Sequence, residues 1–87
     1  MPQLHFYSGL NRFDRNDYAG AASAFAEIER KDLFGDQLPE YSFKNAYACF
    51  ETGDIPAAKA GFKHAEKMPP SDYTAPSRYS LGYINYP

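Results

Sequence analysis

The amino-acid sequence predicts an all-α fold of about five helices, arranged as antiparallel helix hairpins stacked in an array. Three observations support this prediction. The sequence repeats itself at intervals of 37 and 36 residues, its apolar residues recur at helical spacing, and it contains no valine and no alternating run of β-branched residues. Together they favour helices over strands along the whole chain.

The internal repeat aligns residues of the same kind. A shift of 37 residues pairs identical aromatic, acidic and alanine residues: Phe6 with Phe43, Phe13 with Phe50, Asp17 with Asp54, Ala21 with Ala58, and Phe25 with Phe62. A further shift of 36 residues pairs Phe43 with Tyr79, and Tyr47 with Tyr83. We therefore expect a single domain over residues 1–87, with repeat one at about 3–34, repeat two at about 39–70, and the first helix of a third repeat at about 75–86.

The first repeat has the pattern of two helices joined by a short turn. Its first helix is indicated by apolar residues at helical spacing, namely Leu4, Phe6, Tyr7, Leu10 and Phe13. Asn16 suits the left-handed conformation at a helix end, and Asp17 suits the N-cap of the next helix. The second helix is indicated by one apolar stripe, formed by Tyr18, Ala21, Ala22, Phe25 and Ile28.

The second repeat follows the same scheme with clearer boundaries. Pro39 fits the first turn of a helix that runs to about Thr52, and Gly53 fits the stop after it. Asp54 is the expected cap of the following helix, and Pro56 fits its first turn because no intrahelical hydrogen bond is lost there. The buried stripe of that helix is Ile55, Ala58, Phe62 and Ala65. A last helix is expected from Pro76 through Tyr86.

Charge and composition exclude several kinds of partner. The net charge of −2 is too small to draw the protein to nucleic acid or to an anionic membrane surface. No apolar run reaches the roughly 18–20 residues that a membrane span needs, so direct membrane insertion is not expected. Cys49 is the single cysteine, which leaves no intramolecular disulfide and no cysteine-based metal site.

The sequence offers little for catalysis. His5 and His64 fall on different expected helices, without a nucleophile in a recognisable setting. Lysine and glutamate flank His64, which favours a solvated helix face, and Cys49 is more consistent with a buried, inert thiol than with a reactive one. We therefore expect a protein that is not an enzyme, with no catalytic residues, no metal and no cofactor.

The residues at the hairpin turns resemble the tetratricopeptide repeat (TPR) family. That family opens its second helix with Gly-Asp/Asn-Tyr, followed by alanine and then an aromatic residue; the matching residues here are Asn16-Asp17-Tyr18 with Ala21 and Phe25, and Gly53-Asp54-Ile55 with Ala58 and Phe62. The Leu-Gly pair of its first helix appears as Leu81-Gly82, with a small residue at Gly9 and Ala46. The repeats are longer than the usual length of about 34 residues, which looks more like the divergent bacterial repeats of TolA-binding and outer-membrane assembly lipoprotein relatives.

The resemblance implies a right-handed superhelix whose first helices line a concave groove for a protein or peptide partner. The implied groove residues are Phe6, Leu10, Phe43, Tyr47, Tyr79 and Tyr83, whereas helix–helix packing is the alternative for such aromatics and is favoured for Phe13, Phe50 and Tyr86. The implied function is a non-catalytic protein-interaction scaffold. The alternative is a structural spacer or oligomerisation module within a larger cell-envelope protein. The resemblance also points to the envelope or periplasm of a Gram-negative bacterium, with the cytoplasm as the alternative.

The last expected helix is apolar on nearly every side, through Tyr79, Leu81, Tyr83, Ile84 and Tyr86. A terminal repeat normally presents a polar outer face. We therefore expect the chain to belong to a longer array, to expose an apolar patch at Leu81, Tyr83 or Ile84, and to form homodimers through that helix.

Overall fold

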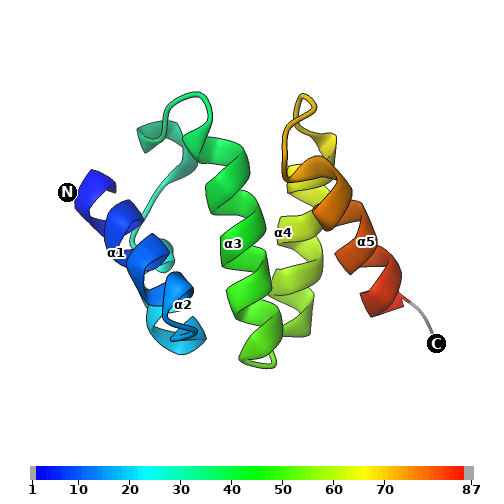
Figure 1. The fold of residues 1–87 in the computed structure, drawn as a ribbon, viewed down its shortest axis with the longest axis horizontal. Helices are drawn as coiled ribbons and strands as arrows, with labels where there is room; N and C mark the ends of the chain where they lie inside the picture. Colours follow the sequence, from blue (N-terminus) through cyan, green and yellow to red (C-terminus); the bar gives the residue numbers. More distant parts are fainter. Residues whose placement is uncertain (1, 86–87) are drawn as a thin grey trace.

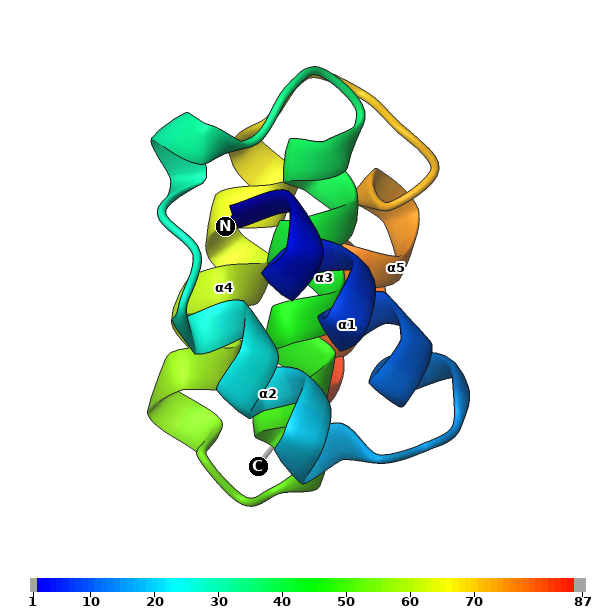
Figure 2. The ribbon, with the colours of Figure 1, turned by 90° about the vertical axis from the view of Figure 1, so that its left-hand side faces the viewer.

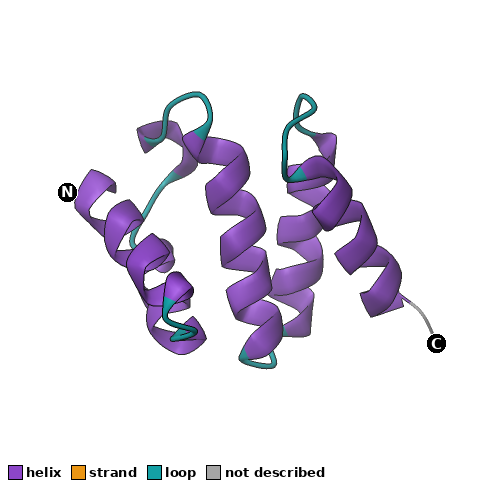
Figure 3. Ribbon diagram, in the orientation of Figure 1, coloured by secondary structure: helices purple, strands orange, loops and turns teal. Residues whose placement is uncertain are grey.

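The computed structural model describes residues 2–85, and this part of the chain is helical, with no strand (Figure 3). Its five α-helices are α1 (Pro2–Asp14), α2 (Tyr18–Ala26), α3 (Gln37–Glu51), α4 (Ile55–Lys67) and α5 (Thr74–Asn85), with a 3-10 turn, η1, at Arg30–Asp32. The prediction of an all-α fold is confirmed. Tyr86, which was expected to end the last helix, lies outside the described residues.

The helices follow one another in chain order along the longest axis of the molecule, so that α1 and α5 lie at opposite ends (Figure 1). Within the two hairpins, α1 packs against α2 and α3 against α4; between hairpins, α2 packs against α3 and α4 against α5. Viewed from the α1 end, α1 and α2 lie in front of α3 and α4 (Figure 2). Each helix therefore buries its apolar side against its neighbours in the sequence.

One aspartate caps the second helix of each hairpin, as predicted. The backbone N–H of Gly20 donates to Asp17 Oδ1 over 3.0 Å, and that of Ala57 donates to Asp54 Oδ1 over 3.3 Å. Each carboxylate thus satisfies a backbone donor that has no partner inside its own helix. The negative charge also lies at the positive end of the helix dipole.

The residue before each cap lets the chain reverse direction. Asn16 has a φ of 62° and Gly53 a φ of 91°, both in the left-handed region. Glycine adopts this conformation without a Cβ clash, and asparagine tolerates it better than most residues. The two short turns therefore have the chemistry that the sequence predicted.

Two clusters of buried side chains form the core. The first joins the α1–α2 hairpin to α3 and contains Phe6, Ala21, Phe25, Ile28, Leu33, Tyr41 and Ala48. The second joins α3, α4 and α5 and contains Ala46, Ala58, Phe62 and Leu81. Burying these apolar surfaces is the main favourable term that holds the helices together.

The structure corrects the sequence-based boundaries in two places. The helix α2 ends at Ala26, so Ile28 lies beyond it, although the Ile28 side chain is still buried. The segment after it forms the 3-10 turn η1, which the sequence did not predict, and Leu33 returns from this turn into the core. A tertiary contact, and not the helical stripe, therefore buries Ile28 and Leu33.

Candidate functional site

The structure separates the six residues predicted to line a groove into two groups. Phe6 is 2% exposed and belongs to the first core cluster, against which Leu10 also packs. Phe43 is half-buried, and its ring centroid lies 5.7 Å from that of Phe62. These three side chains hold helices together and present little surface to a partner.

The other three predicted residues, Tyr47, Tyr79 and Tyr83, come together around one pocket between α3 and α5. The pocket has a volume of about 200 Å³, and among the described residues it is lined by Tyr47, Phe50, Phe62, Tyr79, Ser80, Tyr83 and Ile84. We call it the α3–α5 pocket. Apart from the Ser80 hydroxyl and the tyrosine hydroxyls, its walls are hydrocarbon.

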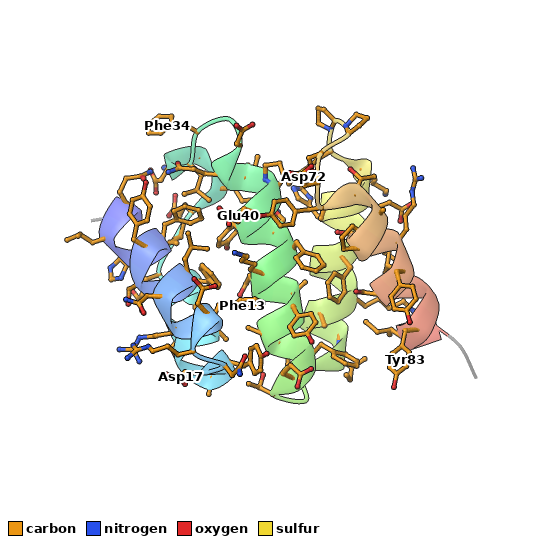
Figure 4. All side chains as sticks on the ribbon, viewed as in Figure 1. Phe13, Asp17, Phe34, Glu40, Asp72 and Tyr83 are labelled. Carbon is orange, nitrogen blue, oxygen red and sulfur yellow. The ribbon has the colours of Figure 1, made fainter. Side chains whose placement is uncertain are left out.

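Each wall of the α3–α5 pocket comes from a different helix. Phe62 of α4 is 1% exposed and is held by the second core cluster. Phe50 of α3 and Tyr83 of α5 meet edge to face, with ring centroids 5.9 Å apart. Tyr83 lies in the C-terminal half of α5, at the far end of the molecule from α1 (Figure 4). Phe50 therefore lines the site, although the sequence favoured a packing role for it.

A row of aromatic rings in edge-to-face and tilted contact supports the α3 wall. The Tyr47 ring centroid lies 5.6 Å from those of both Phe13 and Tyr18, and 6.1 Å from that of Phe43. Phe13 thus packs between helices, as predicted. Burial, followed by the negative charge of Glu51, raises the pKa of Tyr47, so its hydroxyl stays protonated at neutral pH and can donate a hydrogen bond.

The α5 wall is the most accessible part of the site. Tyr79 is 78% exposed and Tyr83 is 67% exposed, whereas Leu81 between them is only 7% exposed. The expectation that Leu81 belongs to an exposed patch is therefore wrong, because Leu81 turns inward and packs with Phe62 and Ala58. The exposed apolar surface of this helix consists of the two tyrosines.

A second hollow lies at the other end of α3 and has a different chemistry. It is lined by Asp36, the first turn of α3 and the loop before α5, and two of its carboxylates, Glu40 and Asp72, are labelled in Figure 4. Glu40 Oε2 accepts hydrogen bonds from Lys44 Nζ over 2.9 Å and from the Tyr73 hydroxyl over 3.1 Å. The Glu40 carboxylate is thus already paired, and it joins α3 to Tyr73, directly before α5.

The residues that the sequence analysis considered for catalysis do not form a cluster. His64 is half-buried on a helix whose neighbouring lysines are exposed; burial, then the charges of Arg30 and Lys67, lowers its pKa below the ordinary 6.5. Burial, then the charge of Asp54, raises the pKa of the half-buried Cys49 thiol, which keeps it in the unreactive protonated form. His5 lies on α1, away from both.

Over residues 2–85, no group of three or more histidine, cysteine, aspartate or glutamate side chains could hold a metal ion. Within the same range, every helix is too short or too polar to cross a membrane. Comparison with known proteins finds no family model, curated protein or solved structure that matches the chain. The assignment of a function consequently rests on the chain's own repeats and contacts.

Proposed function

We propose that the chain is a non-catalytic protein-interaction module of tetratricopeptide type, which holds a partner peptide in the α3–α5 pocket. The observation that carries this proposal is the placement of two exposed tyrosines, Tyr79 and Tyr83, in the lining of an apolar pocket that the side chains of the described residues leave open. Tyrosine and phenylalanine are enriched at the centres of protein interfaces because they bury much area at a small cost in side-chain entropy.

The size of the pocket favours a peptide over a small metabolite. Sites for small molecules have volumes of about 300–1,000 Å³ and usually contain convergent polar groups. A pocket of about 200 Å³ with mostly hydrocarbon walls suits one large apolar side chain. The partner we propose is a peptide that inserts one aromatic or aliphatic residue, while the tyrosine hydroxyls bind its backbone.

The helix arrangement supports the repeat assignment. Every helix packs on its neighbours in the chain, and the aspartate caps recur at the same position of both hairpins. In solenoids of this kind the binding surface is built from equivalent helices of successive repeats. Here α3 and α5 are such equivalent first helices, and the pocket lies between them. A right-handed superhelical path is part of the same proposal.

A peptide-library selection tests the proposal. Peptides selected on the immobilised chain are expected to share one aromatic or aliphatic residue, and the variant Tyr83→Ala is expected to bind them at least about tenfold more weakly, a loss of about 1.4 kcal/mol. The control is Tyr7→Ala, which removes a tyrosine that is 58% exposed on α1 at the opposite end. Equal binding by both variants would contradict the proposal.

The second candidate function, a spacer or oligomerisation module, has one observation in its favour. Both ends of the described molecule expose large apolar side chains: Leu4 and Tyr7 on α1, and Tyr79 and Tyr83 on α5. Such patches favour association through the ends. Sedimentation velocity over a range of concentrations separates the candidates, since only the second predicts oligomers that Tyr7→Ala and Tyr79→Ala each weaken.

A further inference from the structure

The outward side of α4 carries a row of lysines. Lys59, Lys63 and Lys67 recur every four residues, so they lie along one side of the helix. Lys63 and Lys67 are exposed, and Lys59 is half-buried. Within residues 2–85 none of the three forms an ion pair, although the chain has more acidic than basic residues. We call these three residues the lysine face.

The lysine face works against the stability of its own helix. Like charges at i and i+4 repel, and this applies to Lys59 with Lys63 and to Lys63 with Lys67. The partial negative charge at the C-terminal end of α4 favours Lys67, but it is too far from Lys59 to offset that charge. One repeat earlier, the residues equivalent to Lys59 and Lys63 are Ala22 and Ala26. The hairpin itself therefore does not require lysine at these positions.

Further positive charge flanks the lysine face where the two repeats meet. Arg30 lies in η1, is exposed, and is equivalent to Lys67 by the shift of 37 residues. The charged groups that face the half-buried His64 are Arg30 from η1 and Lys67 from α4, and after burial they are the causes that lower its pKa. The positive surface thus continues from α4 onto η1.

The first repeat shows that the chain's own helices leave this side of a hairpin open. Three further α-helices follow α2, yet the residues of repeat one at the equivalent positions, Ser23, Ala26 and Arg30, are exposed. The helix α4 packs on α3 and α5 through its opposite side, which buries Phe62. Figure 2 shows α4 at the left-hand side of the molecule and α5 at the right. Further repeats after α5 would therefore leave the lysine face exposed as well.

We propose that the lysine face binds an acidic helix of a partner protein, whose carboxylates recur every four residues so that each meets one lysine. Four residues of a helix rise about 6 Å, which equals the spacing of the lysines along α4. Each carboxylate then offsets the repulsion between neighbouring lysines. No helix of the described chain carries more than two acidic residues, so a second copy does not supply this partner.

The surroundings of the lysine face favour a protein over other polyanions. Sites for single-stranded nucleic acid combine cations with aromatic rings on which bases stack, but the exposed residue between these lysines is Ala60. Helices that bind membranes insert large apolar side chains. Among the described residues of α4 the exposed large apolar side chain is Ile55, at the end opposite to Lys67. The net charge of −2 also disfavours both.

This inference goes beyond the proposed function. The three lysines do not line the α3–α5 pocket, and they lie on the side of α4 that points away from α3 and α5. Either site can therefore fail its test without the other.

The probe is a synthetic, alanine-rich helix of about 20 residues with capped ends and glutamates at i, i+4 and i+8. Titrated into the isotope-labelled full chain at low salt, it is expected to shift the amide resonances of Lys59, Lys63 and Lys67 saturably. The affinity is expected to fall as salt rises, because exposed charges are screened. A peptide of the same composition, with its glutamates on three sides of the helix, is expected to bind at least about fivefold more weakly.

Charge reversal at the centre of the lysine face tests its role. Lys63→Glu is expected to weaken binding at least about fivefold, because an attraction becomes a repulsion. Lys63 is exposed, so the variant is expected to keep the fold, which circular dichroism checks. The matched control, Arg15→Glu, makes the same change of charge in the turn between α1 and α2, away from α4 (Figure 2). It is expected to change binding by less than about twofold.

The pH dependence gives an independent readout. Carboxylates beside His64 favour its protonated ring, so the complex binds more protons than the free chain. The affinity is therefore expected to rise as the pH falls from about 7.5 to about 5.5, where glutamates with a pKa of about 4.3 stay ionised. His64→Gln is expected to remove this rise.

Other outcomes overturn the proposal. Tighter binding of a single-stranded oligonucleotide, or of anionic phospholipid vesicles, at the same resonances would assign the lysine face to nucleic acid or to a membrane. Equal binding of the two peptides would show that net charge alone is recognised. Shifts confined to Tyr47 and Phe50 would place the peptide in the α3–α5 pocket. A lack of saturable binding at low salt would show that no acidic helix is recognised, and would leave the pocket proposal standing.

Discussion

At the scale of single residues, Gly9 and Gly82 occupy equivalent positions of their repeats but have different surroundings. The Gly9 backbone lies directly under the fully buried ring of Phe25. Among the described residues, no atom lies within 4 Å of the place where a Gly82 Cβ would be. A methyl group therefore has opposite effects at the two sites.

We predict that Gly9→Ala destabilises the fold and that Gly82→Ala stabilises it. Overpacking a core contact costs about 1–3 kcal/mol, which outweighs the about 0.5–1 kcal/mol that alanine gains over glycine inside a helix. At Gly82 there is no overpacking cost, so only the gain of alanine over glycine inside a helix remains. Urea unfolding of the two variants measures both changes, and changes of equal sign would contradict the packing of α1 on α2.

The sequence alone could predict that Gly9, Ala46 and Gly82 are small for the sake of close helix approach, because the repeat places them at one register position. It could not predict which of them is covered. That depends on whether a second helix lies over the position, and only the three-dimensional arrangement shows that Gly82 is open.

At the scale of the helices, capping explains where the second helix of each hairpin begins. Asp54 caps α4 through the Ala57 amide, whereas Asp36 precedes α3 with no side-chain hydrogen bond to that helix. Each of the two aspartates directly precedes a helix. Only Asp54 accepts a hydrogen bond from a backbone N–H that has no partner inside the helix.

We predict that Asp54→Ala lowers the free energy of unfolding by about 0.5–2 kcal/mol, the usual cost of losing an N-cap. The matched control, Asp36→Ala, is expected to change it by less than about 0.5 kcal/mol, as is typical of surface positions. Thermal or urea unfolding followed by circular dichroism measures both. Equal losses would mean that the Asp54 hydrogen bond has no special role.

Local signals account for most of the successful predictions of helices. The caps Asp17 and Asp54 and the left-handed residues Asn16 and Gly53 depend on neighbours within a few residues, so the sequence could reveal them. The end of α2 and the turn η1 were missed. Their residues are held by burial of Leu33 against other helices, which has no local signature.

At the scale of the whole molecule, the buried Tyr41 and the half-buried Tyr73 connect stability to pH. Burial raises the pKa of Tyr41, partly offset by Arg30, and burial followed by the charge of Glu40 raises that of Tyr73, in both cases above the ordinary value of 10.0. The folded state therefore keeps these protons at pH values where the unfolded chain has lost them.

We predict that the free energy of unfolding falls as the pH rises above about 10, through the folded pKa values of these tyrosines, because the unfolded state binds fewer protons there. Below the unfolded pKa this contribution is fully present. Urea unfolding at pH 8 and at successive pH values above 10 measures the decline. Tyr41→Phe is expected to reduce its slope, and an unchanged slope would exclude Tyr41 as a source.

The candidate site could be predicted only in part from the sequence, because it depends on how the whole molecule packs. Tyr47, Tyr79 and Tyr83 gather at the α3–α5 pocket, but Phe6 turns into the core and Phe43 packs on Phe62. Residues at equivalent positions of the repeats lie on the same face of their helices. The rotation and neighbours of each helix then decide whether that face is open, and these depend on the packing of the whole array.

The proposal that the α3–α5 pocket binds a partner peptide is tested most directly by mapping a selected peptide onto the chain with amide and side-chain resonances. We expect saturable shifts at Tyr47, Phe50, Tyr79 and Tyr83, and a binding constant that Tyr83→Ala weakens at least about tenfold. Shifts centred on Leu4 and Tyr7 of α1, with no change at the pocket residues, would contradict it.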